Sequence, residues 1–100
     1  MNPKPSLEPS SGPLAGVRVV ELVGLVPGPF CGMLLADLGA QVLRIDRVEA
    51  AKAVDRSRPA TNAMHRSKQS IGLDLKNRQG VEVFLELCDR SDVAFEVFRP

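Results

Sequence analysis

The sequence predicts an α/β fold, a Rossmann-like parallel sheet assembled from βαβ units. An apolar, β-branched run at residues 17–23 (VRVVELV) precedes a helix-like stretch, and a second apolar run follows at 42–45. About ten helix-like residues separate the two runs, so we expect parallel strands joined by a right-handed crossover. Such continuously apolar strands do not suit a sheet with one face in water, and they call for helices on both faces.

The first predicted helix lies between these two strands. Gly24 ends the first strand, and Pro29 suits the first turn of a helix, where its missing N–H costs nothing. Gly39 is suited to a left-handed helix end. The apolar residues at helical spacing are Phe30, Met33, Leu34 and Leu38.

Residues 48–68 have no sustained period and contain Pro59, which predicts a long, mostly irregular excursion with a helical turn near residues 49–54. A short strand is predicted at 70–75 and a final strand at 93–98 (VAFEVF). Between them, Asn77 is a suitable N-cap for a helix, and Glu86 and Arg90 are correctly spaced for an ion pair. The apolar face of this helix comprises Val81, Phe84, Leu85 and Cys88.

The composition limits the classes of partner. The 100 residues carry 13 Lys+Arg against 12 Asp+Glu, and this near-neutral balance favours neither a nucleic acid nor a membrane surface as partner. No apolar run approaches the roughly 20 residues of a membrane span. Cys31 and Cys88 lie far apart with no metal-ligand or redox spacing, so we expect two buried thiols, no metal site and a cytoplasmic location.

The chain is expected to form the amino-terminal part of a larger domain. Residues 1–13 hold prolines and serines without an apolar core and are predicted to be a disordered lead-in. Residues 14–100 form the structured part, but two helices are too few to cover both faces of the expected sheet. The sequence also stops at the end of a strand, where the next crossover helix is expected.

A dinucleotide site, as in an NAD(P)-dependent oxidoreductase, is one hypothesis for the Gly-rich turn. Such a site needs closely spaced glycines and free N–H groups around a pyrophosphate. Here the glycines stand at 24, 28 and 32, and Pro27 and Pro29 remove two donors. Asp46 occupies the place of a ribose-binding acid, but Arg47 follows it directly. The pattern argues against this class.

Arg47 favours a phosphorylated small molecule instead. It stands at the carboxyl end of a strand, where open α/β sheets bind ligands, and its planar guanidinium can hold a phosphate through two hydrogen bonds. The segment 44–68 is rich in basic residues, which favours a polyanion, although a solvated surface loop fits equally well. Its basic residues are Arg44, Arg47, Lys52, Arg56, Arg58, Arg66 and Lys68, with Asp46, Glu49 and Asp55 as acids.

No catalytic constellation is visible in the sequence. The only histidine, His65, lies in the excursion and is expected at the surface. Glu21 interrupts an apolar strand, and we expect it at an exposed pleat or strand end. The residues alone therefore predict part of an α/β enzyme with a phosphate-binding edge.

Three ordered segments resemble the class III CoA-transferase family, and within it the α-methylacyl-CoA racemases. These segments are GPLAGVRVVELVGLVPGPFCGMLLADLGAQVLRIDR (12–47), SKQSIGLDLKNRQG (67–80) and SDVAFEVFRP (91–100). The resemblance implies an acyl-CoA substrate and an interlocked homodimer, with coenzyme A present as part of the substrate and not as a covalent cofactor. Carried over position by position, it implies a CoA-binding set of Arg47, Leu73, Asp74, Leu75, Lys76, Val97, Phe98 and Arg99.

The resemblance also implies where the chemistry lies. Racemases of this kind remove and return the proton α to the thioester with a His and an Asp, and the transferases form an anhydride on an Asp. Those catalytic residues are expected beyond Pro100, so the 100-residue chain alone is expected to be inactive. His65 and Asp74 do not match the catalytic motif positions. A non-catalytic module that binds CoA or a nucleotide stays open as the alternative.

Two features of the sequence need a structural explanation. The family has an Asn-Lys pair where this chain has Ser67-Lys68, which would remove an amide group near the nucleotide. The Pro27–Pro29 turn is either a stiff joint between strand and helix or a wall of the acyl-thioester pocket. Its residue types favour the joint.

Overall fold

The computed structural model of the chain describes residues 11–24, 27–52 and 63–98. One parallel sheet contains four strands in the order β3-β2-β1-β4, which confirms the predicted α/β class. The strands are β1 (Arg18–Leu22), β2 (Gln41–Asp46), β3 (Lys68–Gly72) and β4 (Val93–Phe95). The helices are α1 (Gly28–Asp37), α2 (Val48–Lys52) and α3 (Arg78–Asp89), with a 3-10 turn, η1 (Ala63–His65).

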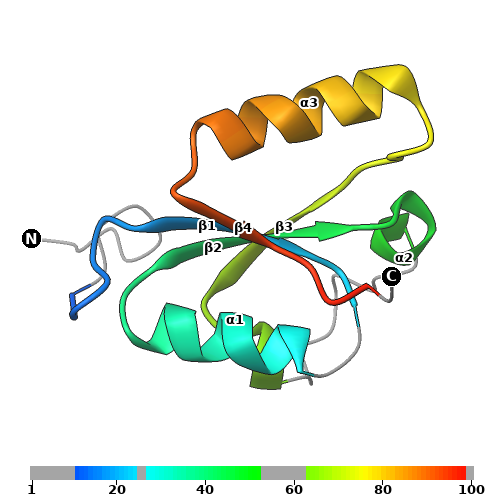
Figure 1. Ribbon diagram of the computed structural model, residues 1–100. Coiled ribbons are helices and arrows are strands. Elements are labelled where there is room, and N and C mark those ends of the chain that lie inside the picture. Colours follow the sequence, from blue (N-terminus) through cyan, green and yellow to red (C-terminus); the bar gives the residue numbers. More distant parts are fainter. Residues whose placement is uncertain (1–10, 25–26, 53–62, 99–100) are drawn as a thin grey trace, which may run out of the picture.

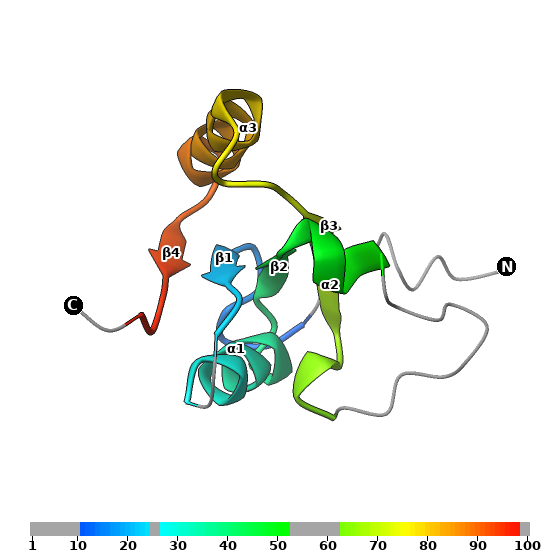
Figure 2. The same ribbon diagram turned by 90° about the vertical axis from the view of Figure 1, so that its right-hand side faces the viewer.

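The helices lie on both faces of the sheet. Figure 1 shows α1 beneath the sheet and α3 above it, and Figure 2 shows the same arrangement after a quarter turn. The short helix α2 follows the carboxyl end of β2. This layering places both long helices as crossovers, as parallel strands require.

The main apolar core lies between the sheet and α1. Val19 and Val42, paired in register, pack with Ala36 and Ala40. On the opposite face Val20 and Ile45 are each only 1% exposed. β1 and β2 are therefore covered on both sides, which explains their continuously apolar sequences.

Helix α1 turns its small residues toward the sheet. Gly28, Gly32, Met33 and Ala36 are buried. Phe30, Leu34 and Leu38 are 45–46% exposed. The prediction that Cys31 is buried is wrong, because this thiol lies on the exposed side of α1. A helix that is apolar on all sides has no single apolar stripe, so its periodicity could not identify the inward face.

Helix α3 begins where predicted, but its predicted apolar face is only partly covered, since Leu85 is 54% exposed. Asn77 Oδ1 accepts a hydrogen bond from Gln79 N at 2.8 Å, which confirms the N-cap. Arg90 Nη2 lies 2.8 Å from Glu86 Oε1, which confirms the ion pair. No α3 side chain is fully buried. Cys88 is therefore only half-buried, contrary to prediction, although burial raises the pKa of its thiol.

The last two strands are shorter than predicted because their partners end. β3 spans Lys68–Gly72 rather than 70–75, since β2 offers pairing only up to Asp46, opposite Gly72. β4 spans Val93–Phe95 rather than 93–98, since its pairing with β1 stops at Glu21. The helical turn predicted near 49–54 is α2, and residues 53–62 lie outside the described residues, as does the lead-in up to residue 10.

Candidate functional site

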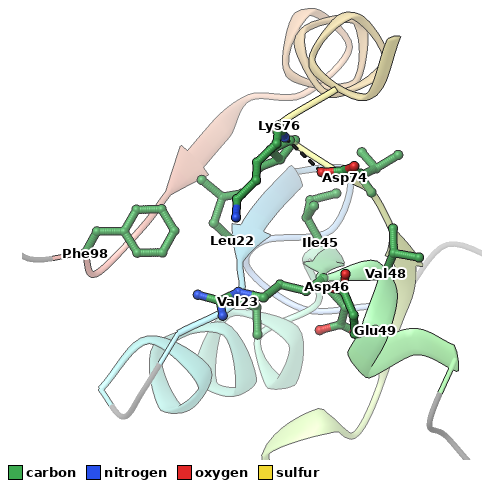
Figure 3. Close-up of a pocket in the computed structure, with 12 residues that line it drawn as sticks. Leu22, Val23, Ile45, Asp46, Val48, Glu49, Asp74, Lys76 and Phe98 are labelled. Atoms are coloured by element: carbon green, nitrogen blue, oxygen red, sulfur yellow. Dashed lines mark hydrogen bonds between the residues drawn. The ribbon is translucent and has the colours of Figure 1, made fainter. Parts of the chain in front are cut away.

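A pocket opens where the strands end. It has a volume of about 700 Å³ and draws residues from the carboxyl side of all four strands (Figure 3). In an open α/β sheet this edge is the expected place for a ligand. The lining residues are Leu22, Val23, Ile45, Asp46, Arg47, Val48, Glu49, Leu73, Asp74, Leu75, Lys76 and Phe98.

The segment after β3 has a defined local structure. Leu73 N donates to Asp46 O at 2.9 Å, which ties this segment to the end of β2. Asp74 Oδ1 accepts from Lys76 N at 3.0 Å, the bond drawn in Figure 3, and forms a local side-chain turn. Asn77 N donates to Asp74 O at 3.1 Å just before α3 begins. These bonds fix the backbone that carries Lys76 at the pocket.

Gly80 allows α3 to start directly against this segment. A Cβ added at Gly80 would lie 2.0 Å from the backbone oxygen of Asp74. Because a backbone atom cannot rotate away, we expect Gly80→Ala to displace the start of α3 or residues 73–76, at a cost of about 1–3 kcal/mol. Urea unfolding measures this cost, with the exposed neighbour changed in Gln79→Ala as control. Equal unfolding midpoints for both variants would contradict the expected crowding.

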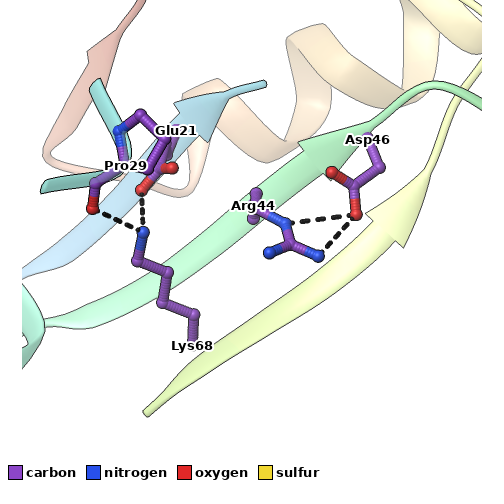
Figure 4. Close-up of polar contacts among 5 residues, drawn as sticks. All are labelled: Glu21, Pro29, Arg44, Asp46 and Lys68. Carbon is purple, nitrogen blue, oxygen red and sulfur yellow. Dashed lines mark hydrogen bonds and ion pairs between the residues drawn. The ribbon is translucent and has the colours of Figure 1, made fainter. Parts of the chain in front are cut away.

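The pocket carries charges of both signs. Arg47 and Lys76 face three carboxylates, those of Asp46, Glu49 and Asp74. Asp46 is already neutralised, because Arg44 donates to its Oδ2 from Nη2 at 2.9 Å and from Nε at 3.1 Å (Figure 4). Arg47, in contrast, is exposed and has no ion pair or hydrogen bond from its side chain among the described residues. No described side chain therefore competes with an anion for the Arg47 guanidinium.

Among the described basic residues of 44–68, three side chains are held by acidic partners and do not form one cationic surface. Arg44 is bound to Asp46, Arg66 pairs with Asp37 at 2.6 Å, and Lys68 is buried. The hydrogen bond from Arg66 also lowers the pKa of Asp37. Of this basic set only Arg47 lines the pocket, while Arg56 and Arg58 lie outside the described residues.

The structure gathers most of the residues predicted to bind a ligand. Arg47, the segment 73–76 and Phe98 all line the pocket. Val97 is not a lining residue, because its side chain lies against Gly24 and Gly28. Arg99 lies outside the described residues. Pro27 and Pro29 do not line the pocket either, which supports the interpretation of the proline turn as a joint.

Two sequence interpretations of single residues are wrong. Glu21 is not at an exposed pleat, since its exposure is 0%. Ser67 is not among the pocket residues, since it directly precedes β3 at the amino end of that strand. Its φ is 60°, a left-handed backbone that Asn adopts more readily than most residues, so an Asn would fit the same turn. His65 is half-buried, and burial together with Arg44 and Lys68 lowers its pKa.

Glu21 pairs with Lys68, a residue whose role the sequence did not reveal. Lys68 Nζ lies 2.8 Å from Glu21 Oε1, and the two side chains are 1% and 0% exposed. The pair lies on the α1 face of the sheet, since Lys68 donates to Pro29 O and Glu21 lies against Gly32, and Figure 4 shows Pro29 beside both side chains. The available signal was Glu21, a carboxylate within the apolar strand β1. Lys68 begins the polar strand β3, and only the register of β1, β2 and β3 brings the two residues together.

The parallel sheet and the pocket at its carboxyl edge define an α/β protein with a candidate ligand site, and comparison with known proteins specifies the family. The model of CoA-transferase family III matches residues 14–100, and the chain belongs to that family. The mouse protein Alpha-methylacyl-CoA racemase is 51% identical over 86 residues, which cover 86% of this chain and 20% of the mouse protein.

Other relatives widen the range of activities. The beta subunit of succinyl-CoA–L-malate CoA-transferase from Chloroflexus aurantiacus is 36% identical over 96 residues, covering 88% of this chain and 24% of that subunit. The crystal structure of a CAIB/BAIF family protein from Brucella suis superposes with a TM-score of 0.71 at 31% identity, covering 87% of this chain and 26% of that one. The chain therefore spans about a quarter or less of the length of these relatives.

None of the helices in the described parts of the chain combines the length and apolar sequence needed to cross a membrane. Residues 11–24, 27–52 and 63–98 also contain no group of three or more His, Cys, Asp or Glu side chains placed to hold a metal ion.

Proposed function

We propose that the edge pocket binds the phosphoadenosine part of coenzyme A, and that the chain contributes this site to an enzyme acting on acyl-CoA thioesters. The observation that carries the proposal is Arg47, an exposed guanidinium without a partner among the described residues at the carboxyl edge of the sheet. A guanidinium holds phosphate through paired, charge-assisted hydrogen bonds. The racemase and transferase names of the relatives support the choice of a CoA thioester.

Each pocket residue has a role in this proposal. Arg47 binds the ribose phosphate or the ribose beside it, and Lys76 is available to a second phosphate. Leu73, Leu75 and Phe98 supply apolar surface to the adenine ring. Phe98 is 55% exposed and Leu75 38%, so both have area to bury on a ligand. Asp74 shapes the segment through its own backbone bond.

Among family activities, we favour an acyl-CoA racemase, because identity is higher to the racemase than to the transferase subunit. In a racemase the proton α to the thioester carbonyl is removed and returned. No pocket residue is assigned that step. We therefore propose that CoA enters as part of the thioester substrate and that the 100 residues alone do not racemise a 2-methylacyl-CoA. We further propose that the whole protein works as a homodimer.

Calorimetric titration of the chain with CoA, 3′-dephospho-CoA and NADPH tests the proposed binding. We expect CoA to bind more tightly than both others, since only CoA combines the adenine with a 3′-phosphate on the ribose. Tighter binding of NADPH would favour an oxidoreductase fragment and would overturn the proposal. Racemisation by the chain alone would show that the reaction needs no residue outside it.

A further inference from the structure

The polar anchor, defined as Glu21, Lys68 and the backbone oxygen of Pro29, ties three elements together. Lys68 Nζ, from the first residue of β3, donates to Pro29 O at 3.0 Å and lies 2.8 Å from Glu21 Oε1 in β1 (Figure 4). Pro29 stands in the first turn of α1. One ammonium group therefore joins the edge strand β3, the inner strand β1 and the start of α1.

Burial of this pair is not explained by stability alone. A fully desolvated ion pair is often no more stabilising than apolar side chains of similar volume. Lys68 Nζ is close to Glu21 Oε1, but neither Glu21 oxygen has a partner with hydrogen-bond geometry among the described residues, so the pair is not fully compensated. The fit around it is nevertheless close, because a Cβ at Gly32 would lie 1.8 Å from Glu21 Oε1. Gly32 therefore leaves room in α1 for the carboxylate of Glu21.

The anchored end of α1 leads to the pocket through direct contacts. Gly28, immediately before Pro29, lies against Val97, since an added Cβ would be 3.1 Å from Val97 Cγ2. At Gly24 the same methyl group would lie 2.7 Å from an added Cβ. Val97 is followed by Phe98, which lines the pocket. The position of the start of α1 therefore sets the position of one pocket wall.

We infer that Lys68 is a positioning residue: balanced by Glu21, it fixes the start of α1 so that Val97 and Phe98 form the β4 side of the pocket. Lys68 does not line the pocket and does not contact the ligand. The inference rests on the proposed function for the identity of the ligand, which is CoA. The geometric part, from Lys68 to Phe98, does not depend on that identity.

The test removes both charges at once. Glu21→Met/Lys68→Met replaces the pair by apolar side chains and deletes the bond to Pro29 without leaving a buried charge. We expect a urea midpoint close to that of the original chain, CoA binding about 5-fold weaker, and displaced amide NMR signals of Gly28 and Phe98. A role limited to stability would leave the CoA affinity and these signals unchanged at the same midpoint.

The matched control is Asp37→Asn/Arg66→Met, which deletes an ion pair at the other end of α1 and leaves the polar anchor intact. We expect unchanged CoA binding and unchanged Gly28 and Phe98 signals. CoA binding in the Glu21→Met/Lys68→Met variant equal to that in the control would overturn the inference. If that variant does not fold, Gly28→Ala replaces it, because the added methyl presses on Val97, and unchanged CoA binding would again overturn the inference.

The two hypotheses fail in different ways. Absence of CoA binding by the original chain would overturn the proposed function. The Gly28 and Phe98 signals of the double variant then decide the inference alone: displacement supports it, and unchanged signals overturn it.

Discussion

Arg47→Ala is expected to weaken CoA binding by about 10- to 100-fold, the loss typical when a hydrogen bond to a charged group is removed. Arg47 lines the pocket and has no partner among the described residues, so its charge is available to the phosphate. Arg47→Lys is expected to recover only part of the affinity, because an ammonium lacks the planar pair of donors. Calorimetric titration at a fixed ionic strength measures both effects.

Two controls separate this contact from a general effect of charge. Arg90, just after the carboxyl end of α3, is paired with Glu86, and Arg90→Ala removes the same formal charge at the end of α3 opposite to the pocket. CoA binding should be unchanged in that variant. The loss caused by Arg47→Ala should also shrink with 3′-dephospho-CoA as ligand. An equal loss in the Arg47 and Arg90 variants would contradict a direct phosphate contact.

Lys68→Met is expected to destabilise the fold by about 3–5 kcal/mol, because it leaves the Glu21 carboxylate buried without its counter-charge. That loss is a large part of the roughly 5–15 kcal/mol that stabilises a typical domain. Urea unfolding followed by circular dichroism measures it. Adding Glu21→Met to the same chain should restore most of the stability, because no buried charge remains.

The comparison for this prediction is Lys76→Met, which removes an exposed ammonium at the pocket. Surface changes of this kind are usually within about 0.5 kcal/mol. A Lys68→Met variant as stable as Lys76→Met would mean that Glu21 reaches water or takes up a proton at little cost. The pair would then not be the buried unit that the structure describes.

Local sequence patterns predicted much of the fold correctly. The apolar runs gave β1 and β2, Pro29 and Asn77 marked the starts of helices, and the i,i+4 spacing gave the Glu86–Arg90 pair. Each of these features depends on residues close in the chain or on a periodic pattern. The edge of the sheet that carries the pocket was predictable for a related reason, since the carboxyl ends of parallel strands meet at one side.

Features set by contacts distant in sequence were not predictable. The burial of Glu21 depends on Lys68, which reaches it only through the register of three strands. The ends of β3 and β4 depend on where their partners stop. The exposed position of Cys31 follows from the close approach of Gly28 and Gly32 to the sheet, which turns the larger side chains outward. For the described cations of the basic segment, ion pairing and not composition decides which side chains remain available to a ligand.

Amide NMR of the chain during CoA titration tests the central claim most directly. If the edge pocket holds the phosphoadenosine group, the largest shifts occur at Arg47, at residues 73–76 and at Phe98, while signals from the middle of α3 stay in place. Shifts confined to another face of the molecule, with Arg47 unaffected, would contradict the assignment of this pocket.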